Sequence, residues 1–267
     1  MKISCIQKDV YLGNVSKNLD TFLPEIESAS GADCGIILLP EMWATGFDYN
    51  NLQSHSKNTS DIVNKLSGIA GANSVIISSL PENKEGEIYN TLFAVDSSGV
   101  KAVYRKNFLF SPLKEDQYFH KGCHITVFEH NGVKLSLHTC YEIRFPELFR
   151  MAAFEGSQLM LVPAIWPAEK QNHWKTMLKA RAIENQCFVA GCNASNAHTN
   201  KKIINCGVSL ISDPWGTTLA EGSESREEVV QCDLDISKCN EIREKIPSFN
   251  DAKNVFEIKR KSKIRTQ

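Results

Sequence analysis

The chain has 267 residues, 42% of them hydrophobic and 23% charged, so it can fold and bury a substantial core. A net charge of −1 excludes a general attraction to nucleic acid or acidic membranes, and every apolar run is far shorter than the roughly 20 residues of a membrane helix. Nine cysteines, an odd number without a CxxC pair, predict reduced thiols and a cytoplasmic protein. Six of these thiols lie in apolar runs and should be buried: Cys5, Cys34, Cys187, Cys192, Cys206 and Cys232.

The first half of the chain alternates strand and helix patterns. The apolar run at 35–39 is typical of a strand that is buried on both faces, and it ends in Pro40-Glu41. Pro24 falls inside a segment with helical periodicity, which predicts a kink or a break there. In chain order, the pattern predicts a strand over 2–7, a helix over 14–28, a strand over 35–39, a helix over 60–70 and a strand over 74–79.

Two strands over 89–95 and 100–104 form a predicted hairpin around the turn Asp96-Ser-Ser-Gly99. This hairpin leads directly into Arg105-Lys106. The residues from 108 to 121 have mixed polarity and no regular period, which predicts a long functional loop.

The stretch from 133 to 156 predicts a strand that ends at Cys140, a short loop and then a helix. Apolar residues alternate with polar ones up to His138. Pro146 suits the first position of a helix, and Gly156 can close it. A thiol placed between a strand and a helix lies near unpaired backbone N–H groups, as nucleophiles do in other α/β folds.

The second half then repeats the order of the first. The strand over 159–162 ends at Pro163, as the strand over 35–39 ends at Pro40, and the turn 213–216 matches the turn 96–99. The remaining predicted elements are a helix over 169–185, a strand over 188–192, a hairpin over 208–211 and 217–220, and a strand over 229–234. Together the elements predict an α/β fold with two mixed sheets packed face to face and helices outside. We expect one domain over 1–246 and a C-terminal arm over 247–267, whose basic end at 259–265 is solvated.

Three polar residues stand where predicted buried strands end: Glu41, Lys106 and Cys140. These types form a complete set for acyl transfer, since a carboxylate can deprotonate a thiol and an ammonium can stabilise the thiolate and an oxyanion. The backbone N–H of Tyr141 could be a second oxyanion donor. Taken singly, each residue also fits an ordinary role as a loop carboxylate, a surface lysine or a buried thiol.

The segments around these three residues resemble the signature segments of the nitrilase, or carbon–nitrogen hydrolase, superfamily. They are Leu39-Pro-Glu-Met-Trp-Ala-Thr-Gly-Phe47, Tyr104-Arg-Lys-Asn-Phe-Leu-Phe110 and Cys140-Tyr-Glu-Ile-Arg-Phe-Pro-Glu-Leu-Phe-Arg150, and the resemblance runs from about Lys2 to Ile246. It implies a four-layer α-β-β-α sandwich, no metal and no other cofactor. It also implies that Glu41 is the general base, Lys106 the oxyanion stabiliser and Cys140 the nucleophile, with Glu115 orienting Lys106 and the amide. Relatives often carry histidine at Phe108 and aspartate at Glu142, which bears on substrate detail.

The resemblance is closest to the ω-amidase branch, whose members hydrolyse ω-amides of 2-oxo diacids such as 2-oxoglutaramate and 2-oxosuccinamate. It implies that Trp166 lines the substrate pocket, although a core tryptophan is an equal alternative. Arg144 is near enough to bind the substrate carboxylate, but we expect a structural ion pair there. The helices after Cys140 and over 169–185 resemble the family's dimer interface, which implies a homodimer.

Three other functions remain open. The chain could be another amidase of the superfamily, acting on N-carbamoyl compounds, aliphatic amides or nitriles. It could be a cysteine–histidine hydrolase that uses His138, although adjacent positions on one strand give poor geometry for proton transfer. It could also be a non-catalytic scaffold, against which the complete set of polar site residues argues.

Overall fold

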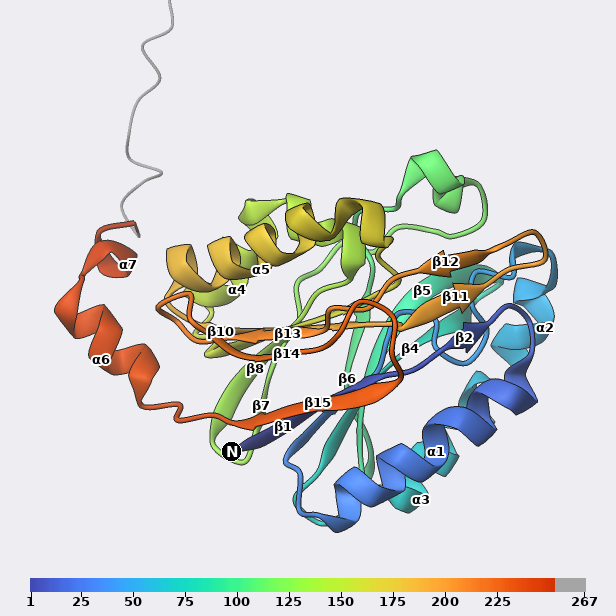
Figure 1. The fold of residues 1–267 in the computed structure, drawn as a ribbon, viewed down its shortest axis with the longest axis horizontal. Helices are drawn as coiled ribbons and strands as arrows, with labels where there is room; N and C mark the ends of the chain where they lie inside the picture. The colour runs from blue at the N-terminus through green and yellow to red at the C-terminus, as the bar shows by residue number, and fades with distance from the viewer. Residues whose placement is uncertain (253–267) are drawn as a thin grey trace, which may run out of the picture.

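The computed structural model describes residues 1–252, and the predicted basic end at 259–265 lies outside them. Two six-stranded mixed sheets pack face to face and helices cover both outer faces (Figure 1). The predicted four-layer α-β-β-α sandwich is therefore confirmed. The first sheet has the strand order β15-β1-β3-β4-β5-β6, and the second has the order β14-β13-β10-β9-β8-β7.

The strands of the first sheet are β1 (Lys2–Gln7), β3 (Ile36–Leu38), β4 (Val75–Lys84), β5 (Glu87–Asp96), β6 (Gly99–Arg105) and β15 (Glu228–Asp233). The strands of the second sheet are β7 (Val127–His130), β8 (Val133–Leu137), β9 (Leu159–Ala164), β10 (Phe188–Asn193), β13 (Leu210–Ser212) and β14 (Thr218–Glu221). The helices are α1 (Val15–Gly31), α2 (Leu52–Lys57), α3 (Thr59–Ile69), α4 (Pro146–Phe154), α5 (Gln171–Asn185), α6 (Lys238–Lys245) and α7 (Ser248–Asp251).

The core lies in three layers that match the apolar faces of these elements. The space between the sheets is filled by side chains of both, among them Ile3 and Leu38 from the first and Leu137 and Leu161 from the second. Helices α1 and α3 cover the outer face of the first sheet, while α4 and α5 cover the outer face of the second (Figure 1). The central strands of each sheet run parallel, so their carboxyl ends meet at common edges.

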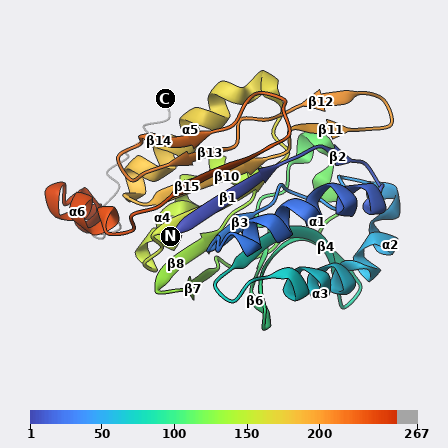
Figure 2. The same ribbon diagram turned by 60° about the horizontal axis from the view of Figure 1, so that its bottom comes forward.

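A third, small sheet of order β12-β11-β2 extends past the ends of the main sheets (Figure 2). Its strands are β2 (Val10–Tyr11), β11 (Asn196–His198) and β12 (Ile203–Asn205). The sequence did not predict it, because each strand is only two or three residues long. Asp9 joins it to the body, since its carboxylate accepts hydrogen bonds from Ser195 and Asn196 and pairs with the His198 Nε2 at 2.6 Å.

The break predicted at Pro24 and the strand end predicted at Pro163 were wrong, and the strand predicted over 74–79 was too short. Helix α1 continues through Pro24 without a break, because that side chain is exposed and water can reach the carbonyl it leaves unpaired. Strand β4 continues through Pro81 to Lys84 and forms an unpredicted hairpin with β5, since β4 has no β3 partner beyond Ile77. Pro163 lies inside β9, where it pairs with Cys192 of β10.

The remaining predicted elements are present with small shifts at their ends. Gly156 follows α4 with a φ of +95°, the left-handed conformation expected of a residue that closes a helix. Five of the six cysteines predicted to be buried are buried, whereas Cys232 is partly exposed on the edge strand β15. None of the helices in the described part of the chain has the length and apolar character needed to cross a membrane. The division of the chain at residue 246 stays a prediction.

Candidate active site

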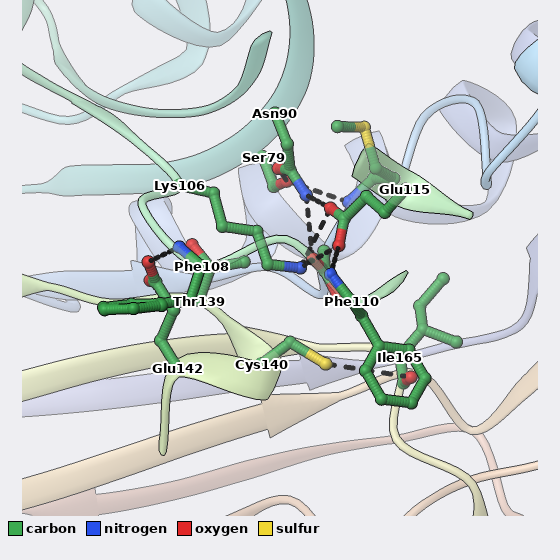
Figure 3. Close-up of polar contacts among 12 residues, drawn as sticks. Ser79, Asn90, Lys106, Phe108, Phe110, Glu115, Thr139, Cys140, Glu142 and Ile165 are labelled. Carbon is green, nitrogen blue, oxygen red and sulfur yellow. Dashed lines mark hydrogen bonds and ion pairs between the residues drawn. The ribbon is translucent and has the colours of Figure 1, made fainter. Parts of the chain in front are cut away.

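The structure brings Glu41, Lys106, Glu115 and Cys140 together in the wall of a cavity of about 500 Å³. Figure 3 shows Lys106, Glu115 and Cys140 of this set. Glu41 follows β3, and Lys106 follows β6. Glu115 begins the short 3-10 turn η3 (Glu115–Gln117), and Cys140 begins the turn η4 (Cys140–Arg144) after β8. The set therefore draws on both sheets, and the ends of buried strands hold the side chains rigidly.

Lys106 is the centre of the charged cluster and is only 2% exposed. Its Nζ lies 2.8 Å from the Glu41 Oε1, and 2.9 and 2.8 Å from the two carboxylate oxygens of Glu115. Burial opposes the charge, but the nearby Glu115 and Glu41 carboxylates hold the pKa of Lys106 well above its usual value. The lysine is therefore an ammonium that can stabilise a developing negative charge.

Asn90 is a member of the cluster that the sequence analysis missed. Its Nδ2 donates to the Glu41 Oε1 at 2.8 Å and to the Glu115 Oε1 at 3.0 Å, and its Oδ1 accepts from the Ser79 hydroxyl. The backbone N–H of Phe110 donates to the other Glu115 oxygen at 2.7 Å. These bonds fix both carboxylates around the lysine; Figure 3 labels Asn90, Glu115 and Phe110. The sequence alone does not distinguish a site asparagine in the middle of a predicted strand from an asparagine that only stabilises the fold.

The predicted loop after Lys106 is present, and it carries Glu115 back to the lysine. The Gly122 N–H donates to the Lys106 carbonyl at 2.8 Å, which closes the loop beside β6. A Cβ atom at Gly122 would lie 2.1 Å from the Arg105 carbonyl oxygen, so only glycine permits this approach.

Cys140 has the backbone of a constrained nucleophile. Its φ is +44°, in the left-handed region that residues other than glycine rarely adopt. The Sγ points across the site toward the Ile165 carbonyl, 4.0 Å away (Figure 3). Burial and then the Glu41 charge raise the pKa of the thiol well above its usual value, against the effect of Lys106. The resting group is a neutral thiol that needs a base.

Glu41 has one oxygen available for that task. Its Oε1 is bound to Lys106 and Asn90. Its Oε2 is buried and has no hydrogen-bond partner among the described residues. An unpaired buried carboxylate oxygen beside a protonated thiol is placed to accept the thiol proton.

His138 has a structural position. Its Nε2 pairs with the Ser136 hydroxyl at 3.0 Å, and its ring stacks on Phe149 with centroids 3.9 Å apart. Burial lowers the pKa of His138 to about 3. A histidine held in this way is a weak base, which argues against the cysteine–histidine hydrolase.

Trp166 lies in the cavity wall and is also buried in the core. Its Nε1 donates to the Lys170 carbonyl at 2.9 Å, and its backbone N–H donates to Asn193. Trp166 is therefore a core residue that also lines the cavity, and its contact with a substrate stays a prediction. The Arg144 guanidinium lies over the Trp166 ring, 4.9 Å from its centroid, and its Nη2 is 3.4 Å from the His173 Nδ1. The expected ion pair of Arg144 was wrong, because no carboxylate of residues 1–252 pairs with it.

The rest of the cavity wall combines aromatic and charged side chains. Aromatic side chains of Phe47, Tyr49, Phe110 and Tyr141 line it, as do strand β12 and Lys202. Three cations reach this wall, namely Arg144, Lys170 and Lys202. The contribution of β12 to the cavity was not predicted, because nothing in the segment 199–205 indicates which distant residues it contacts.

A family model for carbon–nitrogen hydrolases matches residues 2–244. A 2-oxoglutaramate amidase of Bacillus subtilis (strain 168) is 37% identical over 254 residues, which make up 93% of this chain and 96% of that protein. The omega-amidase YafV of Escherichia coli (strain K12) is 31% identical over 253 residues, or 94% of this chain and 96% of that protein.

Solved structures agree with this match. Nit3 of Saccharomyces cerevisiae, a member of the nitrilase superfamily, has a TM-score of 0.83 at 25% identity, over 92% of this chain and 94% of that one. A mutant amidase of Nesterenkonia sp. AN1, whose active-site cysteine carries added acrylamide, has a TM-score of 0.80 at 26% identity, over 92% and 98%. The family match covers most of the chain and the fold agrees throughout, so this chain belongs to the carbon–nitrogen hydrolases of the nitrilase superfamily and is an enzyme of that family.

Proposed function

We propose that this enzyme is an ω-amidase, which releases ammonia from the terminal amide of a small 2-oxo diacid such as 2-oxoglutaramate or 2-oxosuccinamate. The observation that carries the amidase chemistry is the buried Lys106 ammonium, held between two carboxylates beside the Cys140 thiol. The 2-oxoglutaramate amidase and the omega-amidase among its relatives support the substrate class.

The first stage of the proposed reaction forms a thioester. Glu41 Oε2 accepts the thiol proton while the Cys140 Sγ attacks the amide carbon. The carbonyl oxygen becomes an oxyanion, which the Lys106 ammonium and the Tyr141 N–H stabilise. The Tyr141 N–H is available because the first N–H groups of a helical turn have no acceptor within that turn. The tetrahedral intermediate then collapses, the C–N bond breaks, and ammonia leaves with the proton that Glu41 holds.

The second stage returns the enzyme to its starting state. Glu41 accepts a proton from water, and the resulting hydroxide attacks the thioester carbon. The C–S bond breaks, the carboxylic acid leaves, and the thiolate recovers its proton. Glu115 orients Lys106 throughout, since both of its oxygens contact the Nζ.

The cations of the cavity wall supply a partner for the carboxylate at the far end of the substrate. Arg144 lies one turn of η4 from Cys140 and has no ion-pair partner among the described residues. Lys170, by contrast, pairs with Glu169 at 3.0 Å. We infer that Arg144 binds this carboxylate while Trp166 holds the guanidinium from behind, because a planar fork matches a carboxylate.

Arg144→Gln should raise the KM for 2-oxoglutaramate by about 10- to 100-fold and leave kcat within about threefold, because it removes one charge-assisted contact from ground and transition states alike. Steady-state ammonia release measures both constants. Butyramide, which lacks the carboxylate, should react equally with both forms, and Lys170→Gln is the matched control. An unchanged KM would show that Arg144 does not bind the carboxylate.

A panel of amides tests the proposed function itself. Ammonia release is measured with 2-oxoglutaramate, 2-oxosuccinamate, glutamine, N-carbamoylputrescine, N-carbamoyl-β-alanine and a nitrile. Fast release from the 2-oxo ω-amides alone is expected. The cavity of about 500 Å³ is larger than such a small acid fills, which favours a longer amide or N-carbamoyl compound as the second candidate. Release from an N-carbamoyl compound alone would select that candidate.

We also propose a homodimer in a reducing cytoplasm. The outer layer of the second sheet exposes Met151 of α4, Ile183 of α5 and Trp215 of the β13–β14 turn, which are about half exposed. All nine cysteines are free, in keeping with a reducing compartment.

Ile183→Glu should turn the dimer into a monomer at micromolar protein, because a charge would be buried in the interface. Light scattering measures the mass. Val100→Glu, an equally exposed site on β6, is the control and should stay dimeric. A wild-type protein of monomer mass would refute the proposed dimer.

A further inference from the structure

Glu142 is fully buried, carries a carboxylate and has no role in the proposed reaction. It nevertheless accepts four hydrogen bonds. Its Oε1 accepts from the backbone N–H groups of Asn107 at 2.7 Å and Phe108 at 3.2 Å. Its Oε2 accepts from the Tyr104 hydroxyl at 2.7 Å and from the Thr139 N–H at 2.8 Å.

These four donors come from the two segments that carry the reacting groups. Asn107 and Phe108 directly follow Lys106, and Thr139 directly precedes Cys140. One carboxylate therefore joins the end of β6 in the first sheet to the start of η4 after the second sheet. In Figure 3, Glu142 lies on the side of this turn that faces Phe108, and the Cys140 Sγ points the other way, toward Ile165.

We propose that Glu142 is a positioning residue that sets the distance and orientation of the Cys140 thiol and the Tyr141 N–H relative to the Lys106 ammonium. This inference rests on the proposed roles of Cys140 and Lys106. It goes beyond them because Glu142 touches neither the substrate nor the reacting atoms.

The oxyanion site has two halves, the Lys106 ammonium and the Tyr141 N–H. The ammonium and the backbone N–H must both lie about 3 Å from the same oxygen, yet they belong to different sheets. A misplacement of about 1 Å can cost about 100-fold in rate. A carboxylate suits the connection, since it accepts from all four donors at once, whereas an amide would turn an NH₂ group toward at least one N–H.

The protonation of Glu142 gives a second, independent signature. Burial raises the pKa of Glu142 from its ordinary value near 4.5 to about 7, although its donors and the Lys106 charge act against this. The titratable groups around Glu142 come from three elements. Tyr104 of β6 and Lys106, which follows β6, face the carboxylate. The neutral ring of His138 lies beside Tyr104, and Arg181 of α5 donates to the Ile143 carbonyl of η4. As pH falls through 7, the carboxylate gains a proton and loses its role as a fourfold acceptor.

Activity and stability should then respond to acid in opposite directions. A carboxyl group with a raised pKa contributes its full stability below its ordinary pKa and loses it as pH rises through the folded-state value. Between pH 8 and 6, acidification should therefore lower kcat while Glu142 adds to stability. A carboxylate with the same pKa but no positioning role would add to stability in the same way and leave kcat unchanged between pH 8 and 6.

The experiment compares Glu142→Gln and Glu142→Asp with the wild-type enzyme. The Gln variant should lower kcat about 100-fold and change KM less than about threefold, whereas the Asp variant should keep kcat within about tenfold of wild type. Glu129→Gln, an exposed site on β7, is the matched control and should behave as wild type. Melting temperature and kcat of each protein are followed from pH 8 to 6.

The outcomes separate this inference from the proposed function. A Gln variant with kcat within threefold of wild type, or Gln and Asp variants equally impaired, would overturn the positioning role. Where the Gln variant does not fold, the wild-type profile decides: a kcat that falls below pH 7 without a fall in melting temperature supports it, and a flat kcat overturns it. Full activity of Cys140→Ala would instead refute the proposed function.

Discussion

Replacing Cys140 with alanine should reduce ammonia release from the preferred amide by a factor on the order of 10⁴ or more, because the alanine cannot form the thioester. The fold should survive the change. The Sγ has one weak contact, to the Ile165 carbonyl at 4.0 Å, and the φ of +44° is set by the surrounding turn. Circular dichroism and melting temperature check the fold, and an ammonia assay checks the rate.

Cys187→Ala is the matched control, since it removes an equally buried thiol that lies outside the cavity. It should keep full activity. Residual activity of Cys140→Ala near the wild-type level would mean that water attacks the amide directly, and the roles proposed for Glu41 and Lys106 would have to be revised with it.

Lys106→Met should both abolish activity and destabilise the protein. The loss of the ammonium removes one oxyanion donor, which costs roughly 100- to 1000-fold in kcat. It also leaves Glu41 and Glu115 buried without their counter-charge, which should lower the free energy of unfolding by about 3–5 kcal/mol. Urea unfolding and steady-state kinetics measure the two effects separately.

A second change separates the two roles of the lysine. Adding Glu115→Gln to Lys106→Met removes one of the two stranded carboxylates, so it should restore part of the stability and none of the activity. Lys101→Met, which breaks an exposed pair with Asp96, is the control and should change stability by less than about 1 kcal/mol. A Lys106→Met protein with wild-type stability would show that the buried ion pairs do not hold the cluster together.

The sequence predicted the elements that end in reacting groups, because a buried strand followed by a polar residue leaves a clear pattern. The apolar run before Glu41, the hairpin before Lys106 and the strand–turn–helix around Cys140 all hold. The break predicted at Pro24 was wrong because this residue lies where the lost N–H has no buried partner to satisfy.

The parts that the sequence did not predict depend on contacts between distant segments. Asn90 and Glu142 donate to or accept from groups 25 to 49 residues away. Strand β12 pairs with β11, whose residues Asn196 and His198 contact the distant Asp9. The structural ion pair expected of Arg144 also depended on contacts that the sequence does not show. In this fold its neighbours are aromatic, and its charge faces the cavity.

We propose that amide hydrolysis passes through a thioester on Cys140, and hydroxylamine distinguishes this route from direct attack by water. Hydroxylamine added during turnover of butyramide, which has no ketone to form an oxime, competes with water for the thioester; it forms a hydroxamate and releases the Cys140 thiol. We expect a hydroxamate whose ratio to the free acid rises with hydroxylamine concentration. The Cys140→Ala variant should form no hydroxamate. Free acid as the sole product at every hydroxylamine concentration, with ammonia released as usual, would contradict it.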